Sequence, residues 1–186
     1  MAVAVQKLHF TGNDEADALL ASEPFALLMG FALDQQVPVQ TAFSGPLKLK
    51  QRLGTLDPGK IAATDPATLL EAFREKPAIH RFPGSMAERV QQLARVVEQD
   101  YDGDASRLWT EAADGAELRA RIAALPGFGE MKIKALGSVL AKRLGVEAAQ
   151  DLVPNHPTLG DVDSAQALEE YQAKKRAYKA KLRAEK

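Results

Sequence analysis

Leu125-Pro126-Gly127-Phe128-Gly129 is the stretch that decides the fold, because it joins two segments whose apolar residues recur at helical spacing. Residues 116–124 precede it and residues 131–144 follow it. Proline and glycine in the linking residues favour a tight turn over a continuous helix. The stretch therefore predicts two helices joined by a hairpin turn over residues 116–144. The apolar face of the second helix is formed by Ile133, Leu136, Val139, Leu140 and Leu144.

A turn built as Pro-Gly-aromatic-Gly is typical of the helix-hairpin-helix motif. Gly127 and Gly129 can adopt positive φ and carry no side chain, so a nucleic-acid phosphate can approach their amides. The second helix would point its N-terminal N–H groups and the positive end of its dipole at that phosphate. The alternative is a helical hairpin whose glycines only cap and pack. Leu-Pro-Gly-x-Gly is more specific than an ordinary glycine turn, which favours the phosphate-binding interpretation.

Two further segments precede the hairpin. Residues 24–36 begin with Pro24-Phe25 and form an apolar helix that ends in Gln35-Gln36. Gln36 is in helical phase with the apolar face, so it is expected to project from that face at the helix end. A buried amide there needs a hydrogen-bonding partner, and neighbouring backbone is the alternative partner. Residues 82–97 begin Phe82-Pro83-Gly84 and continue as a helix with one apolar stripe: Met86, Val90, Leu93, Ala94 and Val97.

In order and spacing, the three segments resemble the HhH-GPD superfamily of base-excision DNA glycosylases, which includes endonuclease III and 3-methyladenine glycosylase II. The resemblance covers residues 22–145. It implies an all-α, two-lobed fold for residues 1–186 as a single unit, with the N- and C-terminal helices together building one lobe. It also implies base-excision repair of double-stranded DNA by a monomer. The damaged or mispaired base would be flipped into the cleft between the lobes.

The amino-acid composition agrees with this fold class and excludes several kinds of catalytic site. The chain has 186 residues, enough for one domain or two small helical lobes, and it has no sustained period-two pattern. Residues 2–10 are predicted to form one short strand or an apolar lead-in. The absence of cysteine excludes disulfides, a cysteine nucleophile and the iron–sulfur cluster that the endonuclease III branch often carries. The three histidines show no metal-ligand spacing, so metal-free and cofactor-free chemistry is expected.

Helices are expected at residues 14–22, 24–36, 39–53, 66–76, 85–100, 105–112, 116–124, 130–144 and 164–184. Residues 57–59 and 76–84 are predicted to be connections, because they contain proline and glycine. No stretch is long enough to span a membrane, and the N-terminus lacks the profile of a signal peptide. A cytoplasmic, nucleoid-associated location is therefore expected.

The charge of the chain is unevenly distributed. The net charge is −1, yet residues 171–186 hold seven basic residues and one acid. The basic C-terminal helix, residues 164–186, is expected to follow the DNA backbone with sequence-independent, salt-sensitive affinity. A solvated terminal helix is the alternative. A smaller basic set lies on the second hairpin helix: Lys132, Lys134, Lys142 and Arg143.

The resemblance also implies which residues contact DNA and which chemistry follows. Bifunctional relatives place a lysine two residues after the second hairpin glycine, where it attacks the sugar. Met131 occupies that position, and a methionine cannot be the nucleophile. Lys132 is rotated by about 100° and is expected to point elsewhere. A monofunctional glycosylase, in which water replaces the amine, is therefore predicted. The expected DNA-contacting residues are Gln35, Gln36, Leu125, Pro126, Gly127, Phe128, Gly129, Met131, Lys132 and Lys134.

The family also uses an aspartate about 18–20 residues beyond that lysine position, which stabilises the cationic sugar. Asp151 has this spacing, whereas Asp161 and Asp163 directly precede the predicted helix that starts at Ser164. Asp161 is the favoured candidate, followed by Asp151 and Asp163; the alternatives are helix caps or loop acids. The residues that usually surround this aspartate in the family are absent from this sequence. A non-catalytic protein that binds DNA structures or lesions is therefore the second hypothesis, and an all-α protein-interaction module is the third.

One acid lies at an unusual place. Asp34 stands beside the glutamine pair, close to the expected DNA face. It can read a base edge or cap the helix, and the sequence does not decide between the two.

Overall fold

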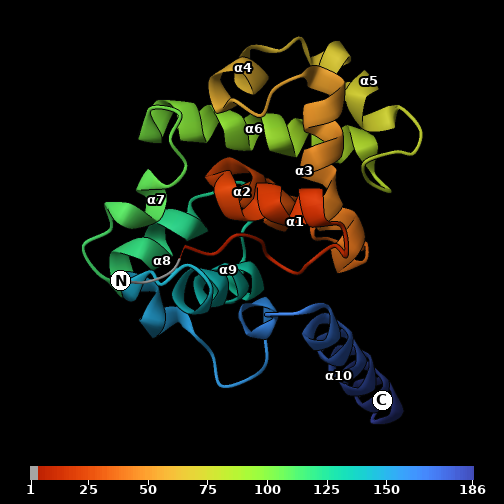
Figure 1. The fold of residues 1–186 in the computed structure, drawn as a ribbon, viewed down its shortest axis with the longest axis vertical. Coiled ribbons are helices and arrows are strands. Elements are labelled where there is room, and N and C mark those ends of the chain that lie inside the picture. The colour runs from red at the N-terminus through yellow and green to blue at the C-terminus, as the bar shows by residue number, and fades with distance from the viewer. Residues whose placement is uncertain (1–3) are drawn as a thin grey trace.

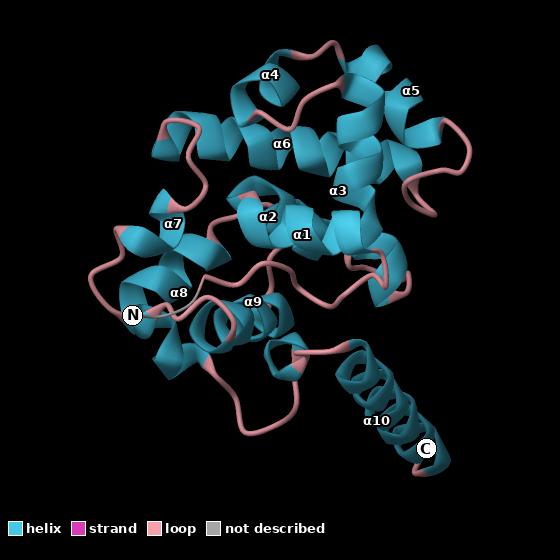
Figure 2. Cartoon of the chain, viewed as in Figure 1, coloured by secondary structure: helices cyan, strands magenta, loops and turns pink. Residues whose placement is uncertain are grey.

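The computed structural model describes residues 4–186, which are all-α: 67% of the chain is helical, and Figure 2 shows no strand among these residues. Residues 4–10 have no regular structure, so of the two alternatives predicted for residues 2–10 the strand does not form there; positions 2 and 3 lie outside the described residues. The elements are α1 (Asp14–Ser22), α2 (Pro24–Leu33), α3 (Val39–Leu53), α4 (Pro58–Ala63), α5 (Pro66–Arg74), α6 (Pro83–Tyr101), α7 (Arg107–Thr110), α8 (Gly115–Ala123), α9 (Glu130–Lys142), α10 (Ala165–Ala184) and the 3₁₀ turns η1 (Glu147–Leu152) and η2 (Leu159–Asp161).

The helices form two groups that follow the order of the chain (Figure 1). In the first, α2 packs on α3, and α4 and α5 pack on α6. In the second, α9 packs on α8, η1 and η2. The expectation was that the N- and C-terminal helices build one lobe together. Instead α1 packs mainly against α2 and α3, whereas α10 packs mainly against η2.

Helix α2 is the centre of the core. Every residue from 25 to 33 is buried, as expected for a helix that is apolar on all sides. Gly30 makes room for Phe43 of α3: a Cβ at position 30 would lie 2.3 Å from Phe43 Cδ1. Phe43 in turn packs edge to face against Phe10 and Phe31, with ring centroids 5.0 Å apart in both pairs. The position of α2 along α3 is therefore fixed by close packing.

Several predicted boundaries were wrong: α6, for example, begins at Pro83, within the predicted connection over residues 76–84. Helix α2 ends at Leu33 rather than at residue 36. Residues 57–59, predicted as a connection, instead begin α4: Asp57 is the N-cap and accepts a hydrogen bond from the Lys60 amide at 2.9 Å, and Pro58 takes the first helical position. Proline is well suited to that position because its φ is already helical and its missing N–H would be unpaired there.

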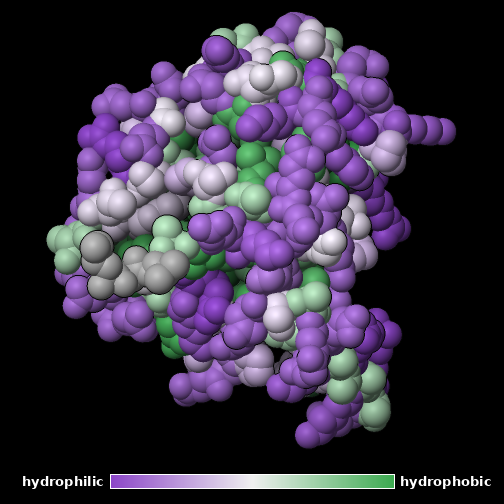
Figure 3. Space-filling view, viewed as in Figure 1, coloured by the Kyte–Doolittle hydropathy of each residue, from purple (hydrophilic) through white to green (hydrophobic). Residues whose placement is uncertain are grey.

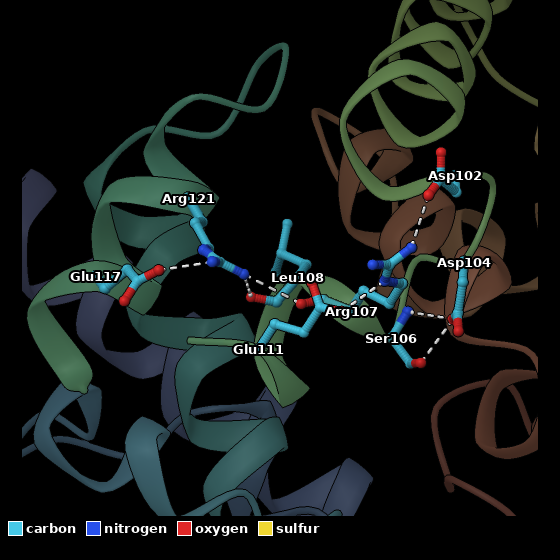
Figure 4. A network of polar contacts seen from close by, with 8 residues as sticks. All are labelled: Asp102, Asp104, Ser106, Arg107, Leu108, Glu111, Glu117 and Arg121. Carbon is cyan, nitrogen blue, oxygen red and sulfur yellow. Dashed lines mark hydrogen bonds and ion pairs between the residues drawn. The ribbon is translucent and has the colours of Figure 1, made fainter. Parts of the chain in front are cut away.

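The junction between the two helix groups is held by a polar network (Figure 4). Arg107 of α7 contacts Asp102, at the end of α6, at 2.9 Å and Glu111 at 2.6 Å. Arg121 of α8 donates to the carbonyl oxygens of Arg107 and Leu108 at 3.1 and 3.4 Å. The first hairpin helix is thereby tied through α7 to the end of α6.

Helix α10 is covered only at its beginning. Ser164 is its N-cap, Leu168 is buried and Tyr171 is half-buried. Farther along the same side, Tyr178 is 63% exposed and Leu182 is 43% exposed. The helix projects from the body (Figure 1), and the projecting part is mostly hydrophilic (Figure 3).

Within residues 4–186, no single helix is both long and apolar enough to cross a membrane. The pair α1 and α2, which is bent by 114°, passes the same length and composition test only when taken together.

Candidate nucleic-acid interface

The hairpin turn forms as predicted between α8 and α9, but its two glycines play different parts. Gly127 has φ +78°, a left-handed conformation that favours glycine. Gly129 is the N-cap of α9 with φ −90° and needs no glycine for its backbone. The expectation of positive φ therefore holds for Gly127 alone. Leu125 and Phe128 are buried and anchor the turn, and the Phe128 amide donates to the Leu125 carbonyl oxygen at 3.2 Å. Pro126 is half-buried.

The start of α9 is open to an incoming anion. Gly129 offers no side chain to cap the helix, and a Cβ placed there would meet no atom within 4 Å. The first amides of a helix have no partner within the helix, and its dipole is positive at this end. Gly127, Gly129 and Glu130 are exposed, and Met131 is 80% exposed. This surface fits a phosphate oxygen.

Lys132 points away from Met131 and toward the end of α2. Its Nζ donates to the Ala32 carbonyl oxygen at 3.3 Å and lies 5.7 Å from the centre of the Phe128 ring. Burial lowers the pKa of Lys132, the positive charge of Arg89 lowers it further, and Asp34 opposes both effects. Lys132 therefore belongs to the junction between the hairpin and α2.

Lys134, unlike Lys132, lies close to a carboxylate. Its Nζ lies 3.8 Å from Glu130 Oε1, and Glu130 also pairs with Arg119 of α8. The hydrogen bond from Arg119 is the largest cause that lowers the pKa of Glu130. The charge of Lys134 is thus partly compensated at the start of α9.

The Gln35–Gln36 loop differs from the prediction. Gln36 was expected on the apolar face of the helix, but it lies beyond the helix end with φ +58° and is exposed. A local turn and His80 hold the backbone at the end of α2: the Gln35 amide donates to the Leu33 carbonyl oxygen at 2.8 Å, and His80 Nε2 lies 3.0 Å from that oxygen and 3.1 Å from the carbonyl oxygen of Gln35. Both carbonyls therefore point at the imidazole instead of continuing the helix.

His80 is held in one protonation state by its surroundings. The Phe82 amide donates to Nδ1 at 2.9 Å, so the proton of the neutral ring is on Nε2, which donates to the loop carbonyls. Burial is the main cause that lowers the pKa of His80, and the charges of Lys132 and Arg89 act in the same direction. The neutral imidazole thus fixes the backbone of the Gln35–Gln36 loop.

Arg89 of α6 joins the glutamine loop to the hairpin. Its Nη1 donates to Gln35 Oε1 at 2.5 Å. Its guanidinium also lies against Gly127, where an added Cβ would be 2.9 Å from Arg89 Nε. Neither Arg89 nor His80 was predicted from the sequence as a site residue. Arg89 precedes the buried Val90 and carries no local signal that it would reach two loops distant in the chain.

Asp161 is not at the hairpin turn. Its Oδ1 lies 2.5 Å from Lys142 Nζ, and its Oδ2 accepts from the Thr158 amide at 2.9 Å in a capping box on η2. Burial raises the pKa of Asp161, but the hydrogen bonds from Lys142 and the Thr158 amide outweigh it, so the pKa is lowered. Lys142 is the last residue of α9, about 16 Å of helix rise from Met131.

The other two predicted aspartates are also placed away from the turn. The Asp151 carboxylate lies against Gly115 at the start of α8, 2.7 Å from where a Cβ would be, and this is the end of α8 opposite the hairpin. Asp163 is exposed between η2 and α10. The N-cap of α10 is Ser164, so neither Asp161 nor Asp163 caps that helix.

Asp34 is the acid that shares its surroundings with the hairpin. It is the C-cap of α2 and is half-buried. Burial raises its pKa, and the charges of Lys175, Lys132 and Lys179 oppose that effect. Burial also raises the pKa of Tyr171, and the negative charge of Asp34 adds to it. Lysines of α9 and α10 therefore act electrostatically on the carboxylate at the end of α2.

Two hollows of the surface lie away from the hairpin. One, of about 430 Å³, is bounded by the start of α2, the end of α3 and the loop that follows α6, and its lining includes Lys50, Asp57 and Asp104. It is lined by no residue of the hairpin or of the Gln35–Gln36 loop. In the part of the chain that the structure describes, no group of three or more histidine and acidic residues is arranged to hold a metal ion.

Comparison with known proteins gave one match. The family model described as "HhH-GPD superfamily base excision DNA repair protein" matches residues 29–184. No curated protein and no solved structure matched the chain. The family match extends past residues 22–145, where the sequence resemblance lay, and includes η1, η2 and α10. With the hairpin and the all-α fold, the match shows that this chain belongs to the HhH-GPD superfamily of base excision DNA repair proteins.

Proposed function

We propose that this protein is a monofunctional DNA glycosylase, which hydrolyses the N-glycosidic bond of a damaged or mispaired base flipped out of double-stranded DNA. One observation carries the monofunctional assignment. Met131 is 80% exposed at the start of α9, at the position where bifunctional relatives place their lysine. The adjacent amine, Lys132, is turned toward the Ala32 carbonyl oxygen. The surface beside the hairpin thus presents a thioether in place of an amine.

The reaction then needs water and a negative charge. The bond between C1′ and the base nitrogen breaks, a water oxygen bonds to C1′, and the water proton passes to the departing base. Positive charge develops on the sugar, as in glycoside hydrolysis, and a carboxylate stabilises it. Asp161, Asp151 and Asp163 remain candidates for this role, but each lies away from the turn.

Asp34 fits the role better than the three predicted aspartates. It stands at the end of α2, beside the Gln35–Gln36 loop, and interacts electrostatically with Lys132 of the hairpin. A half-buried carboxylate in surroundings that exclude part of the water acts more strongly on a nearby cation than an exposed one does. We assign the catalytic carboxylate to Asp34 within this proposal.

The DNA contacts follow from the two loops. The amides at the start of α9, residues 129–132, bind a phosphate, and Gln36, which is exposed and free of the helix, enters the gap left by the flipped base. Truncation of Gln36 to alanine should therefore weaken binding to an abasic analogue more than binding to undamaged duplex. Equal losses on both DNAs would argue against this role.

Two measurements test the proposed reaction. Oligonucleotide duplexes carrying a panel of lesions and mispairs should release free base in the presence of the protein. Abasic DNA incubated with the protein and borohydride should give no covalent complex, because Met131 offers no amine. A trapped complex that disappears in the Lys132→Ala variant would show that the lysine is the nucleophile and would overturn the monofunctional assignment.

A second candidate function is supported by the placement of the predicted aspartates. Asp161 is engaged with Lys142 and the Thr158 amide, and Asp151 lies at the far end of α8. A protein that binds DNA structures or lesions without excising a base fits this arrangement. It would bind DNA in a salt-dependent manner and release no base from any member of the lesion panel.

A further inference from the structure

The junction between the hairpin and the Gln35–Gln36 loop contains two cationic side chains from different helices. Arg89 reaches it from α6 and lies over Gly127, while Lys132 reaches it from α9. Two segments expected to touch DNA, residues 35–36 and 125–129, therefore meet around an arginine that belongs to neither.

Within the part of the chain that the structure describes, neither cation forms a close ion pair, and the Asp34 carboxylate acts on Lys132 only at longer range. Among residues 4–186, no carboxylate oxygen lies within 4.0 Å of the Arg89 guanidinium or of Lys132 Nζ. Each donates instead to a neutral oxygen, Gln35 Oε1 for Arg89 and the Ala32 carbonyl for Lys132. Both side chains are half-buried, so bulk water does not fully compensate for the repulsion between them.

The two charges act on each other and on the histidine below them. The charge of Arg89 lowers the pKa of Lys132, and the charges of Arg89 and Lys132 both lower the pKa of His80. For both groups, burial is the larger cause of the lowered pKa. A like charge in the same surroundings disfavours the charged form of an ionisable group. An anion bound between them would relieve that repulsion.

The geometry leaves donors available for such an anion. A guanidinium has five N–H donors, and the single bond to Gln35 leaves a fork that can grip phosphate oxygens in bidentate fashion. Gly127, which lies beneath the guanidinium, is exposed and carries no side chain that would block approach.

We infer that Arg89 and Lys132 form a binding site for one DNA phosphodiester between the hairpin turn and the Gln35–Gln36 loop. This inference rests on the proposed function for its ligand, DNA, but it does not depend on base excision. The site adds a second phosphate contact to the one made by the amides of α9. Arg89 thereby joins the DNA strand to the Gln35 side chain.

Arg89→Gln is the test variant, because glutamine is neutral yet can still donate to Gln35 Oε1. Arg95→Gln is the matched control: Arg95 lies on α6 as well, is exposed and makes no ion pair within 4.0 Å of a described carboxylate. Binding of a fluorescent duplex is measured over a series of salt concentrations. Losing one phosphate contact reduces the slope of log K against log salt by about 0.9, and this is expected for Arg89→Gln but not for Arg95→Gln.

A second measurement identifies the contact itself. A series of duplexes is prepared in which one phosphate at a time is replaced by a neutral methylphosphonate. At one position the replacement should weaken binding by the parent but should not weaken binding by Arg89→Gln, which has already lost that contact. An unchanged salt slope in a folded Arg89→Gln variant, or a methylphosphonate series that affects the variant and the parent alike, would overturn the inference.

Two controls distinguish loss of the phosphate site from misfolding and from failure of the proposed function. Circular dichroism and denaturant unfolding show whether Arg89→Gln is folded, and Arg89→Lys, which keeps the charge, should retain most of the salt slope if the first variant does not fold. A parent that binds DNA and releases no base would overturn the proposed glycosylase while leaving this site intact. A parent that binds no DNA would overturn both.

Discussion

Gln40 of α3 and Gln172 of α10 exchange two side-chain hydrogen bonds, of 3.0 and 2.7 Å, across 132 residues of sequence. Both side chains are half-buried. This reciprocal amide pair joins the first helix group to the terminal helix, one residue after Tyr171. It fixes where α10 leaves the body, and so where its basic residues begin.

Breaking the amide pair should loosen α10 without unfolding the rest. Gln40→Ala and Gln172→Ala should each lower the free energy of unfolding by about 1 kcal/mol, the usual worth of such hydrogen bonds. The double variant should cost little more than either single one, because the interaction is lost once. Denaturant unfolding of the four proteins measures this, and additive losses would show that the two amides act independently.

Gly129 gives a substitution in which stability and DNA binding change in opposite directions. Its φ of −90° and the open space around it accept a side chain, and serine is a good N-cap residue. Gly129→Ser should unfold at the same or slightly higher denaturant concentration. It should bind duplex DNA about tenfold more weakly for all sequences, because the serine occupies the α9 amides. Unchanged binding by this folded variant would remove the amides of α9 from the interface.

The His80 contacts predict a pH dependence of stability. The pKa of His80 is below 6.5 in the folded protein, so below pH 6.5 the unfolded chain binds the proton more readily. The free energy of unfolding should therefore be constant above that pH and decrease as the pH falls toward the folded pKa. His80→Gln, which can keep one donor toward the loop carbonyls, should remove this dependence. Denaturant unfolding between about pH 5 and pH 8 measures it, and His9→Gln is the control.

The four candidate carboxylates can be ranked by one set of variants. Asp34→Asn should lower single-turnover base release by about 10²–10³-fold, whereas Asp151→Asn, Asp161→Asn and Asp163→Asn should stay near the parent rate. Binding to undamaged duplex should not weaken in Asp34→Asn, since a carboxylate repels phosphate. Because the pKa of Asp34 is raised, the acid limb of the parent's pH–rate profile should lie above pH 3.8. A parental rate in Asp34→Asn with a large loss in Asp161→Asn would return the role to the original candidate.

The helix-hairpin-helix motif could be predicted from sequence because its signals are local. The apolar periodicity of residues 131–144 and the Pro-Gly-Phe-Gly turn lie within one short segment, and α9 forms there as expected. The apolar stripe of α6 is likewise buried as its spacing indicated. In both, the residues that decide the structure are neighbours in the chain.

The site was less predictable because long-range contacts shape it. Helical phase alone continues α2 to Gln36, but His80, 47 residues after Leu33, takes the carbonyl oxygens at the helix end. Arg89 meets Gln35 across 54 residues and has no distinguishing neighbour in sequence. Its place just before a predicted helix favoured Asp161, whose partner Lys142 proved to be at the end of α9 opposite the hairpin. These contacts depend on how α2, α6 and α9 come together.

Because of the Gly30–Phe43 contact, a substitution in the buried core can alter the DNA-facing surface. Because a Cβ at position 30 would lie 2.3 Å from Phe43 Cδ1, even alanine must displace α2 or the Phe43 ring. The end of α2 carries Asp34 and the glutamine loop only a few residues later. A random screen for loss of DNA affinity would therefore recover Gly30 variants alongside Gly129 variants, although position 30 is buried. Only their melting temperatures would distinguish the Gly30 variants, in which α2 is displaced, from the Gly129 variants, in which the α9 amides are blocked.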